Sequence, residues 1–398
     1  MVTSRLFILR RPLLVRATYS KVRYASTKSC DPLRILFCGS DTFSIASLKA
    51  LCKERANNPE TIASIDVVCR PGKRVGRGLK LIREAPIKAV AAQLSLPIHE
   101  IDTFTGWKPP QPQGDPINLI IAVSFGLFVP PRILNAAKYG GLNVHPSLLP
   151  DFWGPAPLHH TLLAGETRTG VTLQTLDTRE FDHGVILDQT PPPGFSIPDP
   201  DTCDVPRLLD LVSNKGAQML VDGIRNRVFV PPLKGVGWHK PGNEAALRHA
   251  GKISPEDRHI NWSSWTAQEI NRRQRALGRL WSNAVIGADS PVSANSGQKK
   301  RVIFTKMELD ESCSLGGLDS IKLDPGVIFA LPDAQTTADE LDRPLYVTTC
   351  DRKIFRIDEL RVQDRGSAPA YRAAKKAKLL NIQPMSSPMP TTFFAGLE

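Results

Sequence analysis

The feature that most constrains the fold is a regular alternation of short apolar runs with segments of helical spacing in the first half of the chain. The expected strands occupy residues 32–41, 65–70, 117–124 and 140–147. The expected helices occupy residues 42–53, 85–95 and 130–137. The run at 117–124 is apolar on both faces, which is typical of a parallel strand covered on both sides. The alternation therefore predicts an α/β fold with a doubly wound, mostly parallel sheet.

The rest of the chain indicates a second, smaller domain. Residues 171–190 have period-two alternation around a polar loop, and 204–226 form an amphipathic helix that ends a first domain of residues 31–232. Residues 233–245 are rich in Pro and Gly and are interpreted as a linker. Beyond it, a helix at 264–277 precedes five short strands separated by turns. They predict a small, OB-like β-barrel domain over 246–398, ending in a basic tail that contains Lys375, Lys376 and Lys378.

The first thirty residues carry most of the positive charge. They hold seven basic side chains and no acidic one, out of a net charge of +12, whereas basic and acidic residues balance over 31–232. An Arg-rich, Ser-rich segment without acids is typical of a mitochondrial transit peptide, so we expect the protein in the mitochondrial matrix. A basic arm that binds nucleic acid is the alternative. A secretory signal is disfavoured because Arg10, Arg11 and Arg16 interrupt the apolar stretch.

The sequence predicts neither a membrane-spanning helix nor a metal site. No run of about eighteen apolar residues occurs, so no membrane-spanning helix is expected. The seven cysteines are scattered and never spaced as C-x-x-C, which argues against a disulfide framework or a zinc cluster. We therefore expect no metal and no membrane partner. We also expect a monomer.

Polar side chains gather where the strand at 140–147 ends. Asn143 and His145 lie two residues apart, so a strand presents both on one face, at the carboxyl edge where parallel sheets bind ligands. Two donors converging on a carbonyl oxygen stabilise the charge that develops when a nucleophile attacks it. Asp182, in the polar loop, could orient His145 or accept a proton, and both roles remain open. The Asn-x-His spacing alone is weak, since an isolated histidine is more often structural.

A longer pattern makes the assignment specific. Residues 142–187, "LNVHPSLLPDFWGPAPLHHTLLAGETRTGVTLQTLDTREFDHGVIL", resemble the signature of the folate-dependent formyltransferases. This resemblance implies that Asn143, His145 and Asp182 surround the formyl group of 10-formyltetrahydrofolate, the formyl donor. It also implies folate contacts from residues on two loops, namely Phe125, Ser147, Leu148, Leu149 and Pro150.

Two further segments resemble the branch of that family that acts on tRNA. Residues 70–84 form a basic, Gly-containing insertion, and 250–262 are similar to the start of that branch's second domain. The resemblance implies initiator methionyl-tRNA as the formyl acceptor, with Arg74, Arg77 and Lys80 binding it. A concentration of basic side chains in an otherwise neutral domain suits phosphates, although a solvated charged loop is the simpler alternative.

Some residues depart from the family pattern or remain ambiguous. Asp151 and Trp153 stand where the family commonly has basic residues. The four arginines of 272–279 indicate either a second basic face or a solvated one, and Trp262 is expected in the core of the second domain. Two other functions stay open: formyl transfer to a small amine, and an inactive relative that only binds RNA.

Overall fold

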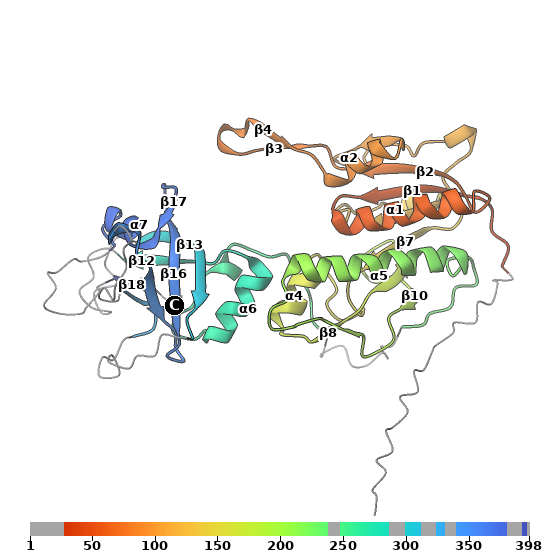
Figure 1. Ribbon diagram of the computed structural model, residues 1–398. Helices are drawn as coiled ribbons and strands as arrows, with labels where there is room; N and C mark the ends of the chain where they lie inside the picture. Colours follow the sequence, from red (N-terminus) through yellow and green to blue (C-terminus); the bar gives the residue numbers. More distant parts are fainter. Residues whose placement is uncertain are drawn as a thin grey trace, which may run out of the picture.

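Two domains lie next to each other in the computed structural model, which describes residues 28–237, 247–285, 299–311, 324–330, 340–379 and 392–395 (Figure 1). Most of the predicted transit peptide and most of the predicted linker lie outside these ranges. Residues 28–30 are described and contact the first domain, because Lys28 Nζ donates hydrogen bonds to the carbonyl oxygens of Val230 and Pro232.

The first domain is built on a seven-stranded sheet of order β10-β9-β7-β6-β1-β2-β5. Its parallel strands are β1 (Leu33–Gly39), β2 (Ile62–Cys69), β5 (Ile98–Glu100), β6 (Leu119–Val123) and β7 (Gly141–His145). Strand β9 (Thr172–Thr175) runs antiparallel to β7, and β10 (Ile186–Gln189) antiparallel to β9. The predicted mostly parallel α/β sheet is confirmed.

Helices cover both faces of this sheet. Helix α1 (Thr42–Asn57) begins at Asp41, whose side chain accepts a hydrogen bond from Ser44 N, and packs with α5 (Val205–Arg225) on one face. Along β1, Ile35 and Phe37 are buried toward these helices, whereas the alternate residues pack toward α3 (Pro131–Leu134). Helices α2 (Pro86–Gln93) and α4 (Pro157–Leu163) complete the set. In the described ranges, no helix is long and apolar enough to cross a membrane.

The basic insertion is a two-stranded hairpin. Strands β3 (Lys73–Val75) and β4 (Leu81–Arg83) pair antiparallel, and the short η1 turn (Arg77–Leu79) forms the tip. In Figure 1 it projects beyond the sheet, toward the side on which the second domain lies. Strands of three basic and apolar residues give too short a pattern to be recognised in the sequence. A second small pair, β8 (Arg168–Thr169) with β11 (Phe195–Ser196), was missed for the same reason.

The second domain is an antiparallel barrel, as predicted. Its sheet order is β13-β12-β18-β14-β15-β16-β17, and the additional pairing of β13 with β16 closes it. The strands are β12 (Trp281–Val285), β13 (Lys299–Leu309), β14 (Val327–Phe329), β15 (Leu345–Thr348), β16 (Ile354–Val362), β17 (Ser367–Pro369) and β18 (Thr392–Ala395). Trp262 is 1% exposed inside it, which confirms its expected place in the core.

The expected basic tail is corrected in part. Residues Ala370–Lys376 form helix α7, which packs on β16 and buries Tyr371 and Ala374. Lys375 and Lys376 thus end a helix whose small, apolar positions face the barrel. The sequence did not reveal this helix, because its buried face consists mainly of alanines, which give only a weak apolar pattern.

The two domains meet where α6 (Ala267–Leu277) packs against α4. The arginines of α6 are engaged in local contacts rather than forming an open basic face. Arg272 and Arg273 pair with Glu269, and Arg275 donates to the carbonyl oxygen of Pro200 at 2.8 Å. At the same interface, His160 Nε2 lies 3.0 Å from the carbonyl oxygen of Gly251.

We predict that Arg225→Met destabilises the first domain. Glu54 of α1 is 2% exposed, and its carboxylate accepts hydrogen bonds from the guanidinium of Arg225 at 2.9 and 2.5 Å. Losing the guanidinium leaves a buried carboxylate short of a partner, at a cost of about 3 kcal/mol. Urea unfolding measures this, with the exposed Arg207→Met on α5 as control. Equal stability of the two variants would contradict the prediction.

Candidate active site

The site is assembled at the carboxyl end of β7, the third strand from one edge of the first domain's sheet. Strand β7 places Asn143 and His145 on one face, as the spacing predicted. Because β9 pairs with β7, Gln174 lies beside Asn143 and Thr172 beside His145. Polar residues on two neighbouring strands thus line one edge of the sheet, where the apolar core ends.

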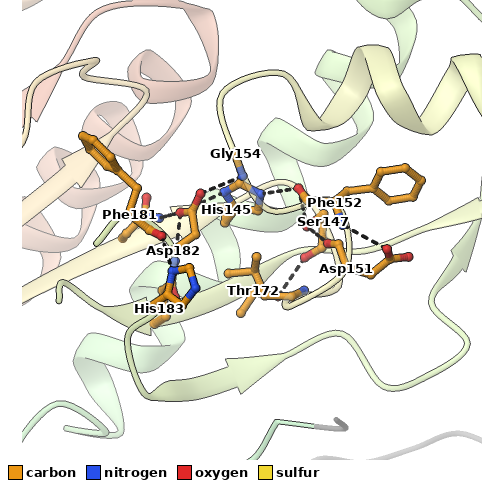
Figure 2. A network of polar contacts seen from close by, with 12 residues as sticks. His145, Ser147, Asp151, Phe152, Gly154, Thr172, Phe181, Asp182 and His183 are labelled. Atoms are coloured by element: carbon orange, nitrogen blue, oxygen red, sulfur yellow. Dashed lines mark hydrogen bonds and ion pairs between the residues drawn. The ribbon is translucent and has the colours of Figure 1, made fainter. Parts of the chain in front are cut away.

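The carboxylate of Asp182 joins these side chains together. Asn143 Nδ2 and Gln174 Nε2 each donate to Asp182 Oδ1 at 3.1 Å. The backbone N–H of Gly154 donates to Oδ2 at 3.0 Å, and His145 Nδ1 lies 3.3 Å from Oδ1. Figure 2 shows Asp182 facing His145 and Gly154 from the loop after β9. The structure therefore brings together all three residues that the sequence singled out as catalytic.

The side chain of Asp182 is only 10% exposed, yet its carboxyl remains ionised. Burial by itself raises the pKa of this carboxyl, because it disfavours the charged form. The neighbouring His145 and the hydrogen bonds from His145, Gly154 and Gln174 outweigh that effect and leave the pKa below its ordinary value. The site thus contains a fixed negative charge, held by donors from three segments of the chain.

His145 is held from both sides. Its side chain is 6% exposed, and while Nδ1 faces Asp182, Nε2 lies 3.1 Å from the carbonyl oxygen of Phe152. Each ring nitrogen faces an oxygen acceptor, so an imidazolium would donate to both. Asn143 is less constrained, because its amide carries a second N–H besides the one directed at Asp182.

A cavity of about 550 Å³ opens beside these residues. This volume is within the range of small-molecule sites. Asn143, His145, Gln174 and Asp182 line one wall, and the loop after β6, residues 124–129, lines another. Asp41, at the start of α1, also borders it, and burial raises the pKa of its carboxyl against opposing hydrogen bonds from Ser44 and Ser124. The cavity presents an apolar space with a few converging polar groups.

The predicted folate-contacting residues divide into two sets. Phe125 lines the cavity. The turn Ser147, Leu148, Leu149 and Pro150 is absent from its lining; Ser147 and Leu149 are both 1% exposed. Thr172 Oγ1 binds both, donating to Ser147 O at 2.7 Å and accepting from Leu149 N at 3.1 Å. The turn thus supports the site from behind, and its contact with folate remains a prediction.

Some site residues were not identified from the sequence. Gln174 could have been found, because pairing the alternating run at 171–175 with the strand of Asn143 would place it opposite that residue. The backbone groups of Phe152 and Gly154 leave no trace in a side-chain pattern. His249 lines the cavity from the second domain, and no local motif marks it.

The basic hairpin presents an exposed positive surface. Arg74 and Lys80 are exposed, and Arg77 is the first residue of the η1 tip. Lys73 and Arg83, both exposed, stand opposite each other in the β3–β4 register. Like charges placed directly across a strand pair destabilise it in the absence of an anion. Gly76 and Gly78 have φ of 81° and 73°, a conformation that glycine adopts without strain.

The cavity and the hairpin are separate features, since the residues that line the cavity do not include those of the hairpin. Within the described ranges, no three His, Cys, Asp or Glu side chains are grouped so that they could hold a metal ion. Asn143, His145 and Asp182 bring an amide donor, an imidazole and an ionised carboxylate to the cavity.

Family models and curated relatives both match this chain to formyltransferases. A family model described as "Formyl transferase" matches residues 33–197, and one described as "Formyl transferase, C-terminal domain" matches residues 252–377. The mitochondrial methionyl-tRNA formyltransferase of Saccharomyces cerevisiae is 35% identical over 71% of this chain and 77% of its own length. That of Homo sapiens is 33% identical over 67% of this chain and 62% of its own length.

A solved structure is also similar. It is an N-formyltransferase from Helicobacter canadensis in complex with folinic acid and dTDP-3-aminofucose, 14% identical, with a TM-score of 0.47. The match covers 82% of this chain and 99% of that chain.

We predict that the stability contributed by Asp182 depends on pH. Because its pKa is lower in the folded chain, this stability is fully present above the ordinary value of 3.8 and is lost as the pH falls through the lowered value. The difference in unfolding free energy between the wild type and Asp182→Asn should therefore shrink as the pH is lowered from about 6 toward about 2. Urea unfolding at successive pH values measures it. A difference independent of pH would show that the carboxylate is not held in this way.

Proposed function

The chain belongs to the methionyl-tRNA formyltransferase family, and from this we propose that it transfers the formyl group of 10-formyltetrahydrofolate to the α-amine of methionyl-tRNA. The observation that best supports this proposal is the anchoring of Asn143, His145 and Asp182 along one wall of the cavity. The neutral amine attacks the formyl carbon and forms a tetrahedral intermediate. The bond from carbon to N10 of the folate then breaks, and the amine proton passes to that nitrogen.

In the proposed mechanism, Asn143 is the main oxyanion donor. Its amide lines the cavity, and its link to Asp182 fixes the side chain while one N–H remains for the substrate. A donor held in place before the reaction stabilises the developing charge without further reorganisation. His145 adds positive charge to the same wall in its protonated form.

We propose that Asp182 acts as an orienting group rather than as the general base. A carboxyl with a lowered pKa is a weak proton acceptor, since efficient bases titrate near the working pH. Its four partners instead make it the group that sets the positions of Asn143 and His145. A proton from the amine would leave through water or through the folate nitrogen.

The donor site is assigned to the wall that contains Phe125. The loop after β6 presents aromatic and aliphatic side chains to the cavity, including Phe125, Leu127 and Phe128. Such a surface suits the flat ring system of a folate, with the formyl group directed toward Asn143. Ser147, Leu148, Leu149 and Pro150 would shape this wall from behind, and no metal is required.

The tRNA is assigned to the hairpin and the second domain. Arg74, Arg77 and Lys80 concentrate charge on a projecting element, which suits the phosphates of an acceptor arm. We propose that residues 31–232 act as the catalytic unit, that 246–398 contribute to tRNA binding, and that 233–245 link them. We further propose a monomer located in the mitochondrial matrix, with residues 1–30 as the transit peptide.

We predict that Asn143→Ala lowers kcat by about 100- to 1000-fold, because it removes an oxyanion donor. The KM for methionyl-tRNA should change little, since the hairpin is untouched. Formylmethionine formation is followed with the full chain, 10-formyltetrahydrofolate and methionyl-tRNA. The exposed Asn135→Ala serves as a matched control. A wild type that binds tRNA without formylating it, or that formylates only a small free amine, would refute the proposed function.

A second prediction concerns the hairpin. Replacing Arg74, Arg77 and Lys80 by Ala should raise the KM for tRNA far more than it lowers kcat. The dependence of binding on salt should also weaken, by roughly one unit of slope for each phosphate that the protein no longer binds. Filter binding from low to high salt measures the slope, with the exposed Lys49→Ala on α1 as control. An unchanged slope would mean that the hairpin does not contact phosphates.

A further inference from the structure

Residues 248–250, at the start of the second domain, pair with the loop 151–156 of the first domain. Ala250 N donates to Trp153 O at 2.7 Å, and Ala156 N donates to Ala250 O at 3.1 Å. Trp153 and His249 form a parallel bridge. Residues 248–250 therefore act as an added strand along the loop 151–156, although the two segments lie far apart in the sequence.

Arg248 holds the first residue of that turn through several contacts. Its NH2 group donates to Asp151 Oδ2 at 2.6 Å and its Nε to Asp151 Oδ1 at 3.2 Å, a bidentate pair. Its backbone N–H also donates to Oδ1, at 3.0 Å. The NH1 group donates to Glu166 Oε1 at 2.5 Å, which fixes the guanidinium from the far side.

The same guanidinium covers the next residue. Its central carbon lies 4.0 Å from the centre of the Phe152 ring, a cation–π contact. The carbonyl of Phe152 is the group that His145 Nε2 faces, and two residues later Gly154 N donates to Asp182. Figure 2 shows the contacts of His145 and Gly154, with Asp151 and Phe152 on one side of His145 and Asp182 on the other. The position of the turn thus sets the partners of both catalytic side chains.

Close packing leaves this turn little freedom. A Cβ added to Gly154 would lie 2.8 Å from both Ala250 O and His249 Nε2, and its φ of 117° also favours glycine. The His249 ring lies 4.0 Å from that of Trp153 and lines the cavity. The added strand therefore contacts the turn from residue 151 to residue 156.

We propose that Arg248 is a positioning residue for formyl transfer, and that through Asp151 and Phe152 it couples the second domain to His145 and Asp182. This inference rests on the proposed function. It also accounts for two departures from the family pattern, since Asp151 and Trp153 stand where basic residues are common. In this chain the second domain supplies the basic groups instead: the guanidinium of Arg248 pairs with Asp151, and the imidazole of His249 lies against Trp153. A tRNA held by that domain would thereby stabilise the turn that completes the active site.

The kinetic test compares Arg248→Met, Asp151→Asn and the double variant in the full chain. Arg248→Met should lower kcat about 10- to 100-fold with little change in the KM for methionyl-tRNA, because the hairpin is intact and only the geometry of the catalytic groups is disturbed. The double variant should be no slower than Arg248→Met, since both changes break one pair. Arg248→Lys keeps the charge but loses the bidentate geometry, so it should recover only part of the rate.

The control is Arg258→Met, at another arginine near the start of the second domain, whose Nε donates to the carbonyl oxygen of Leu277. It should leave kcat unchanged at similar thermal stability. An unchanged kcat in Arg248→Met, or effects that simply add in the double variant, would overturn the inference while leaving the proposed function intact. Absence of formyl transfer in the wild type would instead refute the proposed function.

A second measurement tests the contact between Arg248 and the turn 151–156 without relying on activity. Hydrogen–deuterium exchange of a peptide covering residues 151–156 should be faster in Arg248→Met than in the wild type or in Arg258→Met, because the turn loses its bidentate partner. Equal exchange in all three proteins would overturn the inference whether or not the chain formylates tRNA.

Discussion

The site depends on the hydrogen bonds and the ion pair that hold the carboxylate of Asp182. A buried charge is stable only when it is paired and hydrogen-bonded, and here the partners come from β7, β9 and the turn at residue 154. Because one carboxylate accepts from all of them, moving any partner would leave that charge incompletely bonded. The same requirement that keeps Asp182 ionised therefore also fixes the orientation of Asn143 and His145. The stability of the carboxylate and the geometry of the candidate site arise from a single set of contacts.

The turn 151–154 extends this dependence across the domain boundary. It supplies a carbonyl to His145 and an N–H to Asp182, yet it has no regular secondary structure of its own. Its rigidity comes from Ser147, whose Oγ donates to Asp151 O at 2.8 Å, and from the strand at 248–250. A short loop becomes a well-defined element when residues distant in sequence bind both its side chains and its backbone. Part of the structure of the candidate site in the first domain is therefore supported by residues of the second domain.

The hairpin, in contrast to the cavity, has few stabilising contacts of its own. Its strands are short, its basic side chains repel one another, and Leu79, Leu81 and Ile82 remain largely exposed. Such an element gains little from the rest of the domain, so its composition is best explained by a partner that supplies negative charge and covers apolar surface. Glycines with positive φ at its tip permit the tight turn. The cavity is organised in advance, whereas the hairpin is suited to a large anionic ligand.

Much of this protein could be predicted from the sequence because the relevant patterns are local. Apolar runs such as 117–124 and helical spacing at 42–53 reflect burial on one or two faces, and the structure confirms the sheet, its helices and the barrel. Asn143 and His145 could be placed on one face because a strand has a period of two. Elements such as β3, β4 and α7 are too short or too polar for such patterns. The pairing of Gln174 with Asp182, and of Arg248 with Asp151, was decided only by the tertiary structure, because strand register and domain packing bring together groups that no local periodicity relates.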